Sequence, residues 1–271
     1  MDNGSTDASP EIVGRFGDQI HTLTIRQRGA NYARNAILEH ATGEWIQYLD
    51  ADDYLEPEKI SGQLKEAGIQ GPDSKGEVLY SPVLINEHGR TSISGIDPDL
   101  DLYAQWIAWQ LPQTGACLWR KTTLQQLGGW NVSMPCCQEH ELYLRAIQAG
   151  CCFQFTPTAK AVYRIWSDET LCRKDPVLVI KTRTELIDRM LGWLEQNGQV
   201  TPVHNNIAGR AFFEMARTWA RHDLNRAAEY LRMNQSRGLL RLNGAAAPLL
   251  YRICFRLFGF KNAELIAKQL R

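Results

Sequence analysis

Three carboxylates stand within four residues at Asp50, Asp52 and Asp53, directly after a nearly all-apolar run at residues 45–49. Carboxylates this close repel one another, and the repulsion costs stability unless a positive group is bound among them. A hard divalent cation such as Mg²⁺ or Mn²⁺ prefers oxygen ligands of this kind. The structural alternative is that Asp52 or Asp53 caps a helix that Pro57 opens.

Two other polar segments lie upstream of this cluster. The first is the hexapeptide DNGSTD at residues 2–7, whose composition is also typical of an ordinary turn before a helix. The second spans residues 28–36 and carries Arg34 and Asn35 among small and apolar neighbours. An arginine in that position can pair with a phosphate or a carboxylate, or it can lie on the surface without a partner.

The elements that must position these residues alternate along the first half of the chain. Residue patterns predict strands at 20–25, 45–49 and 78–84, and helices at 30–41 and from about 57 to 68. Such alternation is typical of a mostly parallel sheet with helices on both faces, where ligands bind at the carboxyl ends of strands. The acidic cluster follows a strand at such an end.

The second half is less regular up to residue 165. It contains two predicted helices and two short predicted strands, at 118–127, 139–149, 153–156 and 161–164. Beyond residue 176 the pattern is helical, in segments at about 177–197, 203–234 and 239–260. We therefore expect an α/β domain over residues 1–170 and a helical C-terminal region over residues 171–271.

Charge is balanced over the chain but not along it. Thirty basic and thirty acidic residues give no net charge, so no global field attracts nucleic acid. Residues 235–271 nevertheless carry a net charge of +6, and from Pro248 to Phe260 they include a broad apolar face with Leu249 and Leu257. This pattern is consistent with peripheral contact with a membrane through residues 235–271, with a helix docked on its own domain, or with a dimer contact.

The cysteines and the polar start favour a cytoplasmic protein. The chain has seven cysteines, an odd number, with adjacent pairs at 136–137 and 151–152. Residues 1–4 do not have the pattern of a secretory signal, so reduced thiols are expected. Four of the cysteines could bind zinc, but their spacing lacks the usual CxxC form.

Taken together and in this order, the motifs resemble the family 2 glycosyltransferases of the GT-A fold. DNGSTD and the run GANYARNAILEHATGEWIQYLDADD at residues 29–53 carry the resemblance. LGGW at residues 127–130 and QEHELYLR at residues 138–145 continue it, so that it covers about residues 1–165. The resemblance implies a Rossmann-like, mostly parallel GT-A sheet with helices on both faces, followed by a helical C-terminal region.

The resemblance also implies a role for individual residues. Asp2 would contact the nucleotide base, Arg34 would lie near the nucleotide, and Asp50 would lie near the ribose and diphosphate. Asp52 would hold a divalent cation, Mg or Mn, on the diphosphate. The implied reaction is an inverting, metal-dependent transfer of a sugar from a nucleotide-diphosphate sugar to a hydroxyl of a glycan or lipid-linked acceptor, in the synthesis of a cell-surface polysaccharide.

A general base must take the proton of the acceptor hydroxyl. Family members have an acidic pair in a motif like EDxxLxxR, and aligning on Leu142 and Arg145 puts Gln138 and Glu139 at that pair. Glu139 therefore falls on the base position, where the family usually has aspartate. His140 is a rival base, and the structural alternative is that Glu139 is a first-turn carboxylate favoured by the helix dipole.

Two departures from the family pattern bear on function. Family members begin with a strand carrying a PxYN-like motif and a helix, whereas here Met1 directly precedes Asp2. We expect a start further upstream or a fragment, and poor folding or nucleotide binding by the chain as written. Where many relatives have a histidine after a similar YR pair, this chain has Trp166. Trp166 cannot bind a metal, so no protein ligand beyond the aspartates is expected from that position. The missing first strand and the glutamate at position 139 make a catalytically inactive binding or scaffold protein the rival interpretation, and a nucleotidyltransferase is a weaker one.

Overall fold

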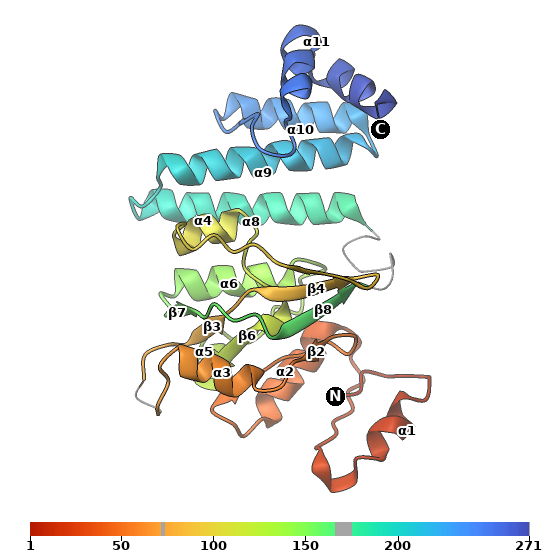
Figure 1. The fold of residues 1–271 in the computed structure, drawn as a ribbon, viewed down its shortest axis with the longest axis vertical. Coiled ribbons are helices and arrows are strands. Elements are labelled where there is room, and N and C mark those ends of the chain that lie inside the picture. Colours follow the sequence, from red (N-terminus) through yellow and green to blue (C-terminus); the bar gives the residue numbers. More distant parts are fainter. Residues whose placement is uncertain (72–73, 166–174, 271) are drawn as a thin grey trace. The chain divides into compact units, whose positions relative to one another are not determined.

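The computed structural model describes residues 1–71, 74–165 and 175–270 (Figure 1). The chain divides into two compact units. The first comprises Met1–Ile96 and Leu111–Trp166, and the second comprises Asp97–Gln110 and Ser167–Arg271. The predicted domain boundary between residues 170 and 171 lies outside the described residues.

Two four-stranded sheets form the framework of the first unit. One has the order β1-β6-β3-β7, with strands at Trp45–Ile46, Cys117–Arg120, Val78–Tyr80 and Phe153–Phe155. The other has the order β2-β8-β4-β5, with strands at Tyr54–Leu55, Ala161–Ile165, Val83–Glu87 and Arg90–Ile93. Each sheet contains one parallel pair, β3 with β7 and β8 with β4, and its other pairs are antiparallel.

The prediction of a mostly parallel sheet is wrong, because both sheets are mixed. Residues 118–127 were predicted as a helix, but their first part is β6, which inserts antiparallel between β1 and β3. The single strand predicted at 78–84 is two strands in different sheets, because Ser81 and Pro82 separate β3 from β4 and proline cannot donate to a ladder. A two-residue turn at His88 and Gly89, both with positive φ, then returns the chain antiparallel as β5.

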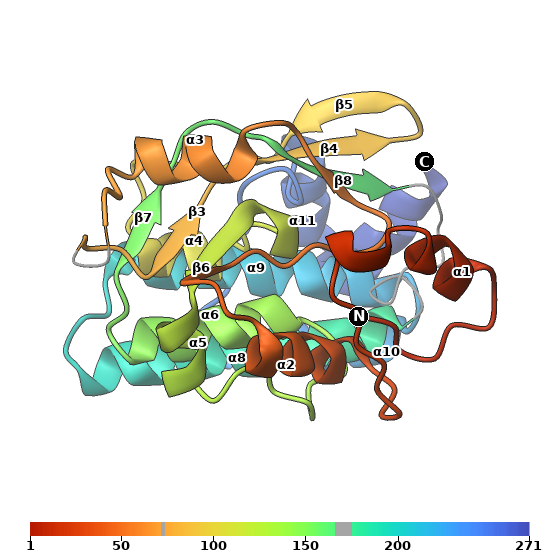
Figure 2. The same ribbon diagram turned by 90° about the horizontal axis from the view of Figure 1, so that it is seen from below.

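The first unit also contains helices. They are α1 (Ser9–Gly14), α2 (Ala30–His40), α3 (Lys59–Glu66), α5 (Lys121–Gln126) and α6 (Gln138–Gln148). Of these, α1 buries no residue. Figure 2 shows α3 on one side of β3, β6 and β7, and α2, α5 and α6 on the other. The predicted helices at 30–41 and 139–149 are confirmed as α2 and α6. The predicted strand at 20–25 is reduced to a single bridge between Asp2 and Thr24.

The core of the first unit explains why α6 and β3 form where they do. Leu142, Leu144 and Ile147 of α6 are buried, as are most residues from 140 to 147, so this helix is enclosed on nearly every side. Val78 and Leu79 of β3 are fully buried on both faces of the strand, as expected for a central strand covered on both sides. Burial of this apolar surface fixes the position of α6, which begins with Gln138 and Glu139.

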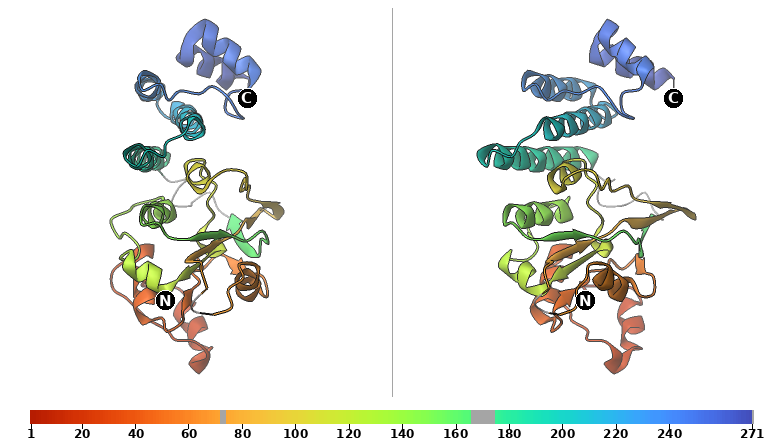
Figure 3. Two further views of the ribbon diagram at one scale, coloured as in Figure 1. Left: turned by 90° about the vertical axis from the view of Figure 1, so that its left-hand side faces the viewer. Right: turned by 60° about the vertical axis from the view of Figure 1, so that its left-hand side comes forward.

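The second unit is helical. Its elements are α4 (Leu102–Ile107), α8 (Pro176–Gln196), α9 (Pro202–Ala220), α10 (Leu224–Ser236) and α11 (Leu249–Gln269). Figure 3 shows α8, α9 and α10 side by side. Fully buried side chains such as Ile187 of α8 and Phe212 and Phe213 of α9 form the core between them. No helix among the described residues has the length and apolar character needed to cross a bilayer.

Helix ends in the second unit differ from the prediction at two places. The single helix expected at 203–234 is broken, because the Asp223 side chain accepts hydrogen bonds from the backbone N–H groups of Asn225 and Arg226 and so begins α10. The helix expected at 239–260 begins only after Pro248 and extends to Gln269. Gly259, with φ 74° and ψ 174°, interrupts it and divides α11 into two helical segments.

Candidate active site

Arg34 on α2 is the centre of a polar cluster in the first unit. Its side chain is almost fully buried, yet the terminal nitrogens of its guanidinium contact three acidic or amide side chains. Nη2 donates to Asp50 Oδ1 at 2.8 Å, and Nη1 donates to Gln138 Oε1 at 3.0 Å. Glu139 Oε1 lies 3.9 Å from Nη2. The segment after β1 and the start of α6 therefore meet through one arginine.

The Trp130 ring fixes the plane of this guanidinium. The guanidinium carbon of Arg34 lies 4.4 Å from the ring centroid, and Tyr48 packs edge-on against the same ring at 5.3 Å. Asn35 holds Trp130 with two backbone hydrogen bonds, accepting from its N–H at 2.7 Å and donating to its carbonyl at 2.8 Å. Cation–π contact and these bonds pre-position Arg34 toward the carboxylates.

Thr114 holds the carboxylate of Glu139. Its hydroxyl donates to Glu139 Oε1 at 2.6 Å, a short charge-assisted bond, and accepts from Arg34 Nη2 at 3.4 Å. The neighbouring His140 is turned away into the interior, where it is buried and packs edge-on against Tyr143. Of the two predicted bases, only Glu139 is thus found at the Arg34 cluster.

The loop after Asp50 is tied to β8. The backbone N–H of Asp53 donates to Asp50 O at 3.1 Å, which closes a tight turn. Asp53 Oδ1 accepts from the Arg164 backbone N–H at 2.8 Å, and the Arg164 guanidinium donates to the backbone carbonyl of Asp52. These contacts hold the acidic cluster at the edge of the sheet that contains β8.

Negative charge accumulates at this loop. Burial raises the pKa of Asp53 to about 6, and the charges of Asp52 and Asp50 add to the rise while the hydrogen bond from Arg164 opposes it. A cation bound among these oxygens would relieve that repulsion. Carboxylate oxygens are the donors that Mg²⁺ and Mn²⁺ prefer, so the chemistry of the donor set fits such an ion. Among the described residues, however, no group of three or more His, Cys, Asp or Glu side chains could hold a metal by itself.

Asp2 lies in a separate turn that is braced against the start of α2. Ser5 N–H donates to Asp2 Oδ1 at 3.1 Å, and hydrogen bonds from the Ser5 side chain and backbone lower the pKa of Asp2. Asn3 connects the turn to the helix, since its amide donates to Gln27 O at 2.6 Å and its Oδ1 accepts from Gly29 N–H at 2.8 Å. The DNGSTD turn and the helix of Arg34 are therefore in direct contact.

Two sequence motifs of the second half also meet. Arg145, at the end of the QEHELYLR run, donates to the backbone carbonyls of Leu127 and Gly129, the latter at 2.8 Å. The buried carboxylate of Glu141 keeps the Arg145 guanidinium in this position, with 2.9 Å between Glu141 Oε2 and Arg145 Nη2. The LGGW turn is thereby fixed next to α6, and its Trp130 reaches Arg34.

The structure therefore brings Arg34, Asp50 and Glu139 together, with Asp52 two residues beyond Asp50 and Asp2 in its own turn. Sequence reasoning missed Thr114 and Arg164. Arg164 belongs to the YR pair at residues 163–164, which entered the sequence analysis only because of Trp166, two residues farther along. Trp166 lies outside the described residues. No motif marks Thr114, because it lies in a short 3₁₀ turn, Thr114–Ala116, between segments of ordinary composition.

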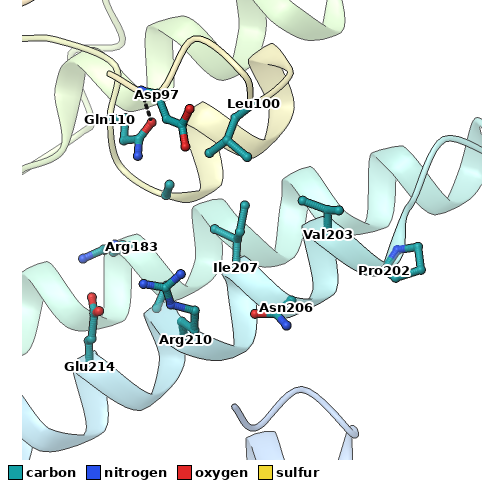
Figure 4. A pocket seen from close by; sticks show the side chains of 12 residues that line it. Asp97, Leu100, Gln110, Arg183, Pro202, Val203, Asn206, Ile207, Arg210 and Glu214 are labelled. Carbon is teal, nitrogen blue, oxygen red and sulfur yellow. Dashed lines mark hydrogen bonds between the residues drawn. The ribbon is translucent and has the colours of Figure 1, made fainter. Parts of the chain in front are cut away.

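A separate cavity of about 670 Å³ lies within the second unit, lined by residues of the 97–110 segment, α8 and α9 (Figure 4). Figure 4 shows Arg183, Arg210 and Glu214 gathered toward one end of it. Asp97 also lines the cavity, so that two arginines are matched by two acids. The lining has no net charge that would select an anion or a cation.

Comparison with known proteins connects the N-terminal part of the chain to a family. Residues 1–82 match the model of the family described as Glycosyl transferase family 2. The putative glycosyltransferase EpsH of Bacillus subtilis is 32% identical over 71 residues, 25% of this chain and 21% of that protein. The succinoglycan biosynthesis protein ExoO of Rhizobium meliloti is 34% identical over 73 residues, 26% of this chain and 21% of that protein. The matches thus span about a fifth of the length of these relatives.

A third relative has a more specific description. The UDP-Glc:alpha-D-GlcNAc-diphosphoundecaprenol beta-1,3-glucosyltransferase WfaP of Escherichia coli is 38% identical over 66 residues, 23% of this chain and 26% of that protein. Each of these three sequence matches is confined to about a quarter of the chain.

Two solved structures share the fold over nearly the whole chain. Residues 1–349 of Staphylococcus aureus TarS match with a TM-score of 0.58 and 13% identity, over 99% of this chain and 80% of that one. The mannosyltransferase PcManGT of Pyrobaculum calidifontis, solved with GDP-Man and Mn²⁺, matches with a TM-score of 0.51 and 19% identity, over 98% and 74%. At these identities the likeness establishes a GT-A-like fold and no more.

Proposed function

We propose that this chain, which belongs to glycosyl transferase family 2 through residues 1–82, transfers a sugar from a nucleotide-diphosphate sugar to a hydroxyl acceptor with inversion at the anomeric carbon. The observation that supports this most directly is the convergence of Asp50 and Glu139 on the Arg34 guanidinium. The resemblance to the family implies that Asp50 serves the donor and Glu139 the acceptor. A single cluster that joins them is what a direct transfer between two substrates requires.

In the proposed reaction the acceptor oxygen bonds to the anomeric carbon from the side opposite the leaving group. The bond from that carbon to the diphosphate oxygen breaks, and the nucleoside diphosphate departs with the bonding electrons. Glu139 takes the proton of the acceptor hydroxyl, and the Thr114 hydroxyl keeps the Glu139 carboxylate in place. Asp2, Arg34 and Asp50 hold the donor, with Asp2 toward the base and Asp50 toward the ribose and diphosphate.

We further propose that the reaction depends on a divalent cation. Asp52 would hold it, and the carboxylate cluster from Asp50 to Asp53 would supply the negative field that favours it. Bound there with the diphosphate, a divalent cation would neutralise charge that develops on the leaving group. PcManGT, the structural neighbour solved with GDP-Man and Mn²⁺, supports this choice of ion.

The acceptor is proposed to be a glycan or a lipid-linked sugar. The relatives named for succinoglycan biosynthesis and for a diphosphoundecaprenol-linked sugar support a role in the synthesis of a surface polysaccharide. A lipid-linked acceptor implies work at the membrane, so we propose a cytoplasmic enzyme that is peripheral to the inner face of the membrane.

Measuring turnover and nucleotide binding separately in two matched variants tests the proposal. Glu139→Gln keeps the size of the side chain and removes its basicity, so transfer from a panel of UDP- and GDP-sugars with Mn²⁺ should fall by about 10²- to 10⁴-fold. Binding of the nucleoside diphosphate, followed by calorimetry, should be retained. Glu39→Gln, an exposed change on α2, should alter neither quantity. Near-normal turnover by Glu139→Gln would reject Glu139 as the base, and nucleotide binding without turnover by the unchanged chain would favour the inactive binding or scaffold protein.

A further inference from the structure

The first segment of α11, residues 249–258, has two apolar faces. On the inner face, Tyr251 and Phe255 pack against Phe213 of α9, with ring centroids 5.8 and 6.2 Å apart. Arg217 of α9 stacks on the Tyr251 ring at 3.9 Å and pairs with Glu264 farther along α11. These contacts attach α11 to its own unit and complete the inner face.

The outer face is equally apolar but exposed. Leu249, Ile253 and Leu257 follow one another at intervals of four residues, which aligns them along one side of the helix. Their exposed fractions are 66%, 45% and 68%, and Leu250 and Phe258 extend the same surface at 59% and 55%. Five large apolar side chains within ten residues exceed the scattered exposure that is normal on a soluble surface. We call these five residues the outer face of α11.

The charges around the outer face are positive. Arg256 is exposed on the same segment. Lys261 and Lys268 are exposed on the second segment of α11, where Lys261 Nζ donates to Asn225 of α10 at 2.7 Å. The sole acidic residue of 235–271 is Glu264, which is buried and bound to Arg217 and to the Tyr251 hydroxyl at 2.7 Å. Because this carboxylate is already neutralised inside the unit, the exposed charges that α11 itself presents to solvent are those of its basic residues.

We propose that the outer face of α11 docks on a membrane surface that contains anionic phospholipid. Leucine, isoleucine and phenylalanine would enter the boundary between headgroups and acyl chains, with the helix lying along the interface, and Arg256 and Lys261 would contact lipid phosphates. A second copy of the chain fits this face less well. In a twofold contact each residue meets its own copy or a neighbour of it, so the same arginine and lysine residues would be brought together.

The purpose of such membrane binding, access to a lipid-linked acceptor, rests on the proposed function. The expectation that the chain binds a membrane follows from α11 alone. Two pairs of variants of the full chain separate the apolar from the electrostatic contribution. In the first pair, the double change Leu250→Gln and Leu257→Gln is matched by the single change Ile93→Gln, at a residue of β5 that is 62% exposed. In the second, Arg256→Gln is matched by Arg15→Gln, at an exposed arginine of the first unit.

The experiment is flotation with vesicles of phosphatidylcholine alone or with about one third phosphatidylglycerol. The unchanged chain should float with the anionic vesicles only, and binding should weaken as salt is added. The leucine double variant should lose binding at least about tenfold, and Arg256→Gln should lose about fivefold, while both matched controls float like the unchanged chain. Failure to float with anionic vesicles would overturn the proposal, as would equal loss in a variant and its control.

Two further measurements distinguish a membrane from a second copy of the chain, and membrane binding from catalysis. Light scattering after gel filtration reports oligomeric state. If the unchanged chain is a dimer and the leucine double variant is a monomer, the outer face belongs to a second copy and the membrane proposal is rejected.

Hydrolysis of the donor sugar without vesicles should be equal in the unchanged chain and the α11 variants. Retained hydrolysis without flotation would reject the membrane proposal alone, and flotation without hydrolysis would reject the proposed function alone.

Discussion

Arg34 Nη2 lies 2.8 Å from Asp50 Oδ1, in a pair whose arginine is buried and whose aspartate is partly open to solvent. The aspartate immediately follows the mostly apolar run at residues 45–49, which begins with β1, and the arginine lies in the middle of α2. Because the guanidinium is enclosed, its remaining donors must be used inside the protein, and they go to Gln138, Thr114 and Asn31. Arg34 therefore joins the two halves of the first unit as well as the two sides of the candidate active site.

Replacement of Arg34 should be costly for this reason. Arg34→Ala leaves the carboxylates of Asp50 and Glu139 without their shared cation. Since Asp50 is partly solvated, we expect a loss of about 1–3 kcal/mol in the free energy of unfolding, less than for a fully enclosed pair. Arg15→Ala removes the exposed Arg15–Glu11 pair and should change stability by no more than about 0.5 kcal/mol. Urea denaturation of both variants measures the difference, and equal losses would contradict the central role of Arg34.

Thr114 should act as a positioning residue for Glu139. Thr114→Val keeps the shape of the side chain but removes the hydroxyl that donates to Glu139 Oε1 at 2.6 Å. We expect kcat to fall about tenfold or more while the KM for the donor changes little, because the base is misplaced and the donor contacts remain. Thr114→Ser restores a donor and should recover most of kcat. If valine and serine reduce kcat equally, the hydroxyl is not what holds Glu139.

Asp53 should make stability depend on pH. Its pKa in the folded protein is about 6, above the ordinary value of 3.8, so between these values the folded chain holds a proton that the unfolded chain has released. Its contribution to stability therefore falls as the pH rises from about 4 to about 6. Asp53→Asn should remove this penalty and still accept the hydrogen bond from Arg164.

Because Asp53 is half-buried, solvent screening reduces the effect to about 1 kcal/mol, or about 2–4 °C in Tm at pH 7.5. Thermal unfolding of the variant and the unchanged chain at pH 4.5 and 7.5 measures it. Asp7 supplies a control of opposite sign, since hydrogen bonds from the side chain and backbone of Ser9 lower its pKa. Asp7→Asn should give no gain at pH 7.5, and a similar gain in both variants would exclude the assigned cause.

The spacing of apolar residues located α2, α6 and α8 along the chain. It did not predict what each helix buries, since the buried residues of α2 are Asn31, Arg34 and Leu38 and α6 is enclosed on nearly every side. Strand pairing was predicted poorly. Whether β6 lies antiparallel between β1 and β3 depends on contacts between residues about 40 to 75 positions apart, and short-range periodicity contains no information on those. The 97–110 segment likewise groups with the second unit for reasons that only packing reveals.

The candidate site could be predicted where charged residues cluster in an unusual pattern along the chain. Asp50 and Arg34 were identified from their types and neighbours, and the structure brings them within 2.8 Å. Thr114 could not be identified, since a threonine in a short turn is common and its partner Glu139 is 25 residues away. Arg164 reaches the acidic loop from β8, a contact that exists only once β2 and β8 pair. The roles assigned to Asp2, Arg34, Asp50, Asp52 and Glu139 stay predictions.

The two glycines of the LGGW turn provide a last matched test, of how the turn supports Arg34. Both have positive φ, 76° for Gly128 and 71° for Gly129, so alanine at either position carries a backbone penalty of about 1 kcal/mol. Their surroundings differ. A Cβ at Gly129 would lie 2.5 Å from Asn35 Oδ1, whereas nothing lies within 4 Å of a Cβ at Gly128.

Gly129→Ala must therefore displace Asn35, which binds the backbone of Trp130 on both sides and so keeps its ring over Arg34. We expect Gly129→Ala to cost about 1–3 kcal/mol more than Gly128→Ala in urea denaturation, because hydrogen bonds are lost in addition to the backbone strain. Turnover should fall in the same order if the Trp130 ring orients the guanidinium. Equal stability of the two variants would mean that Asn35 moves aside freely, and that Arg34 is held by its carboxylates without help from this turn.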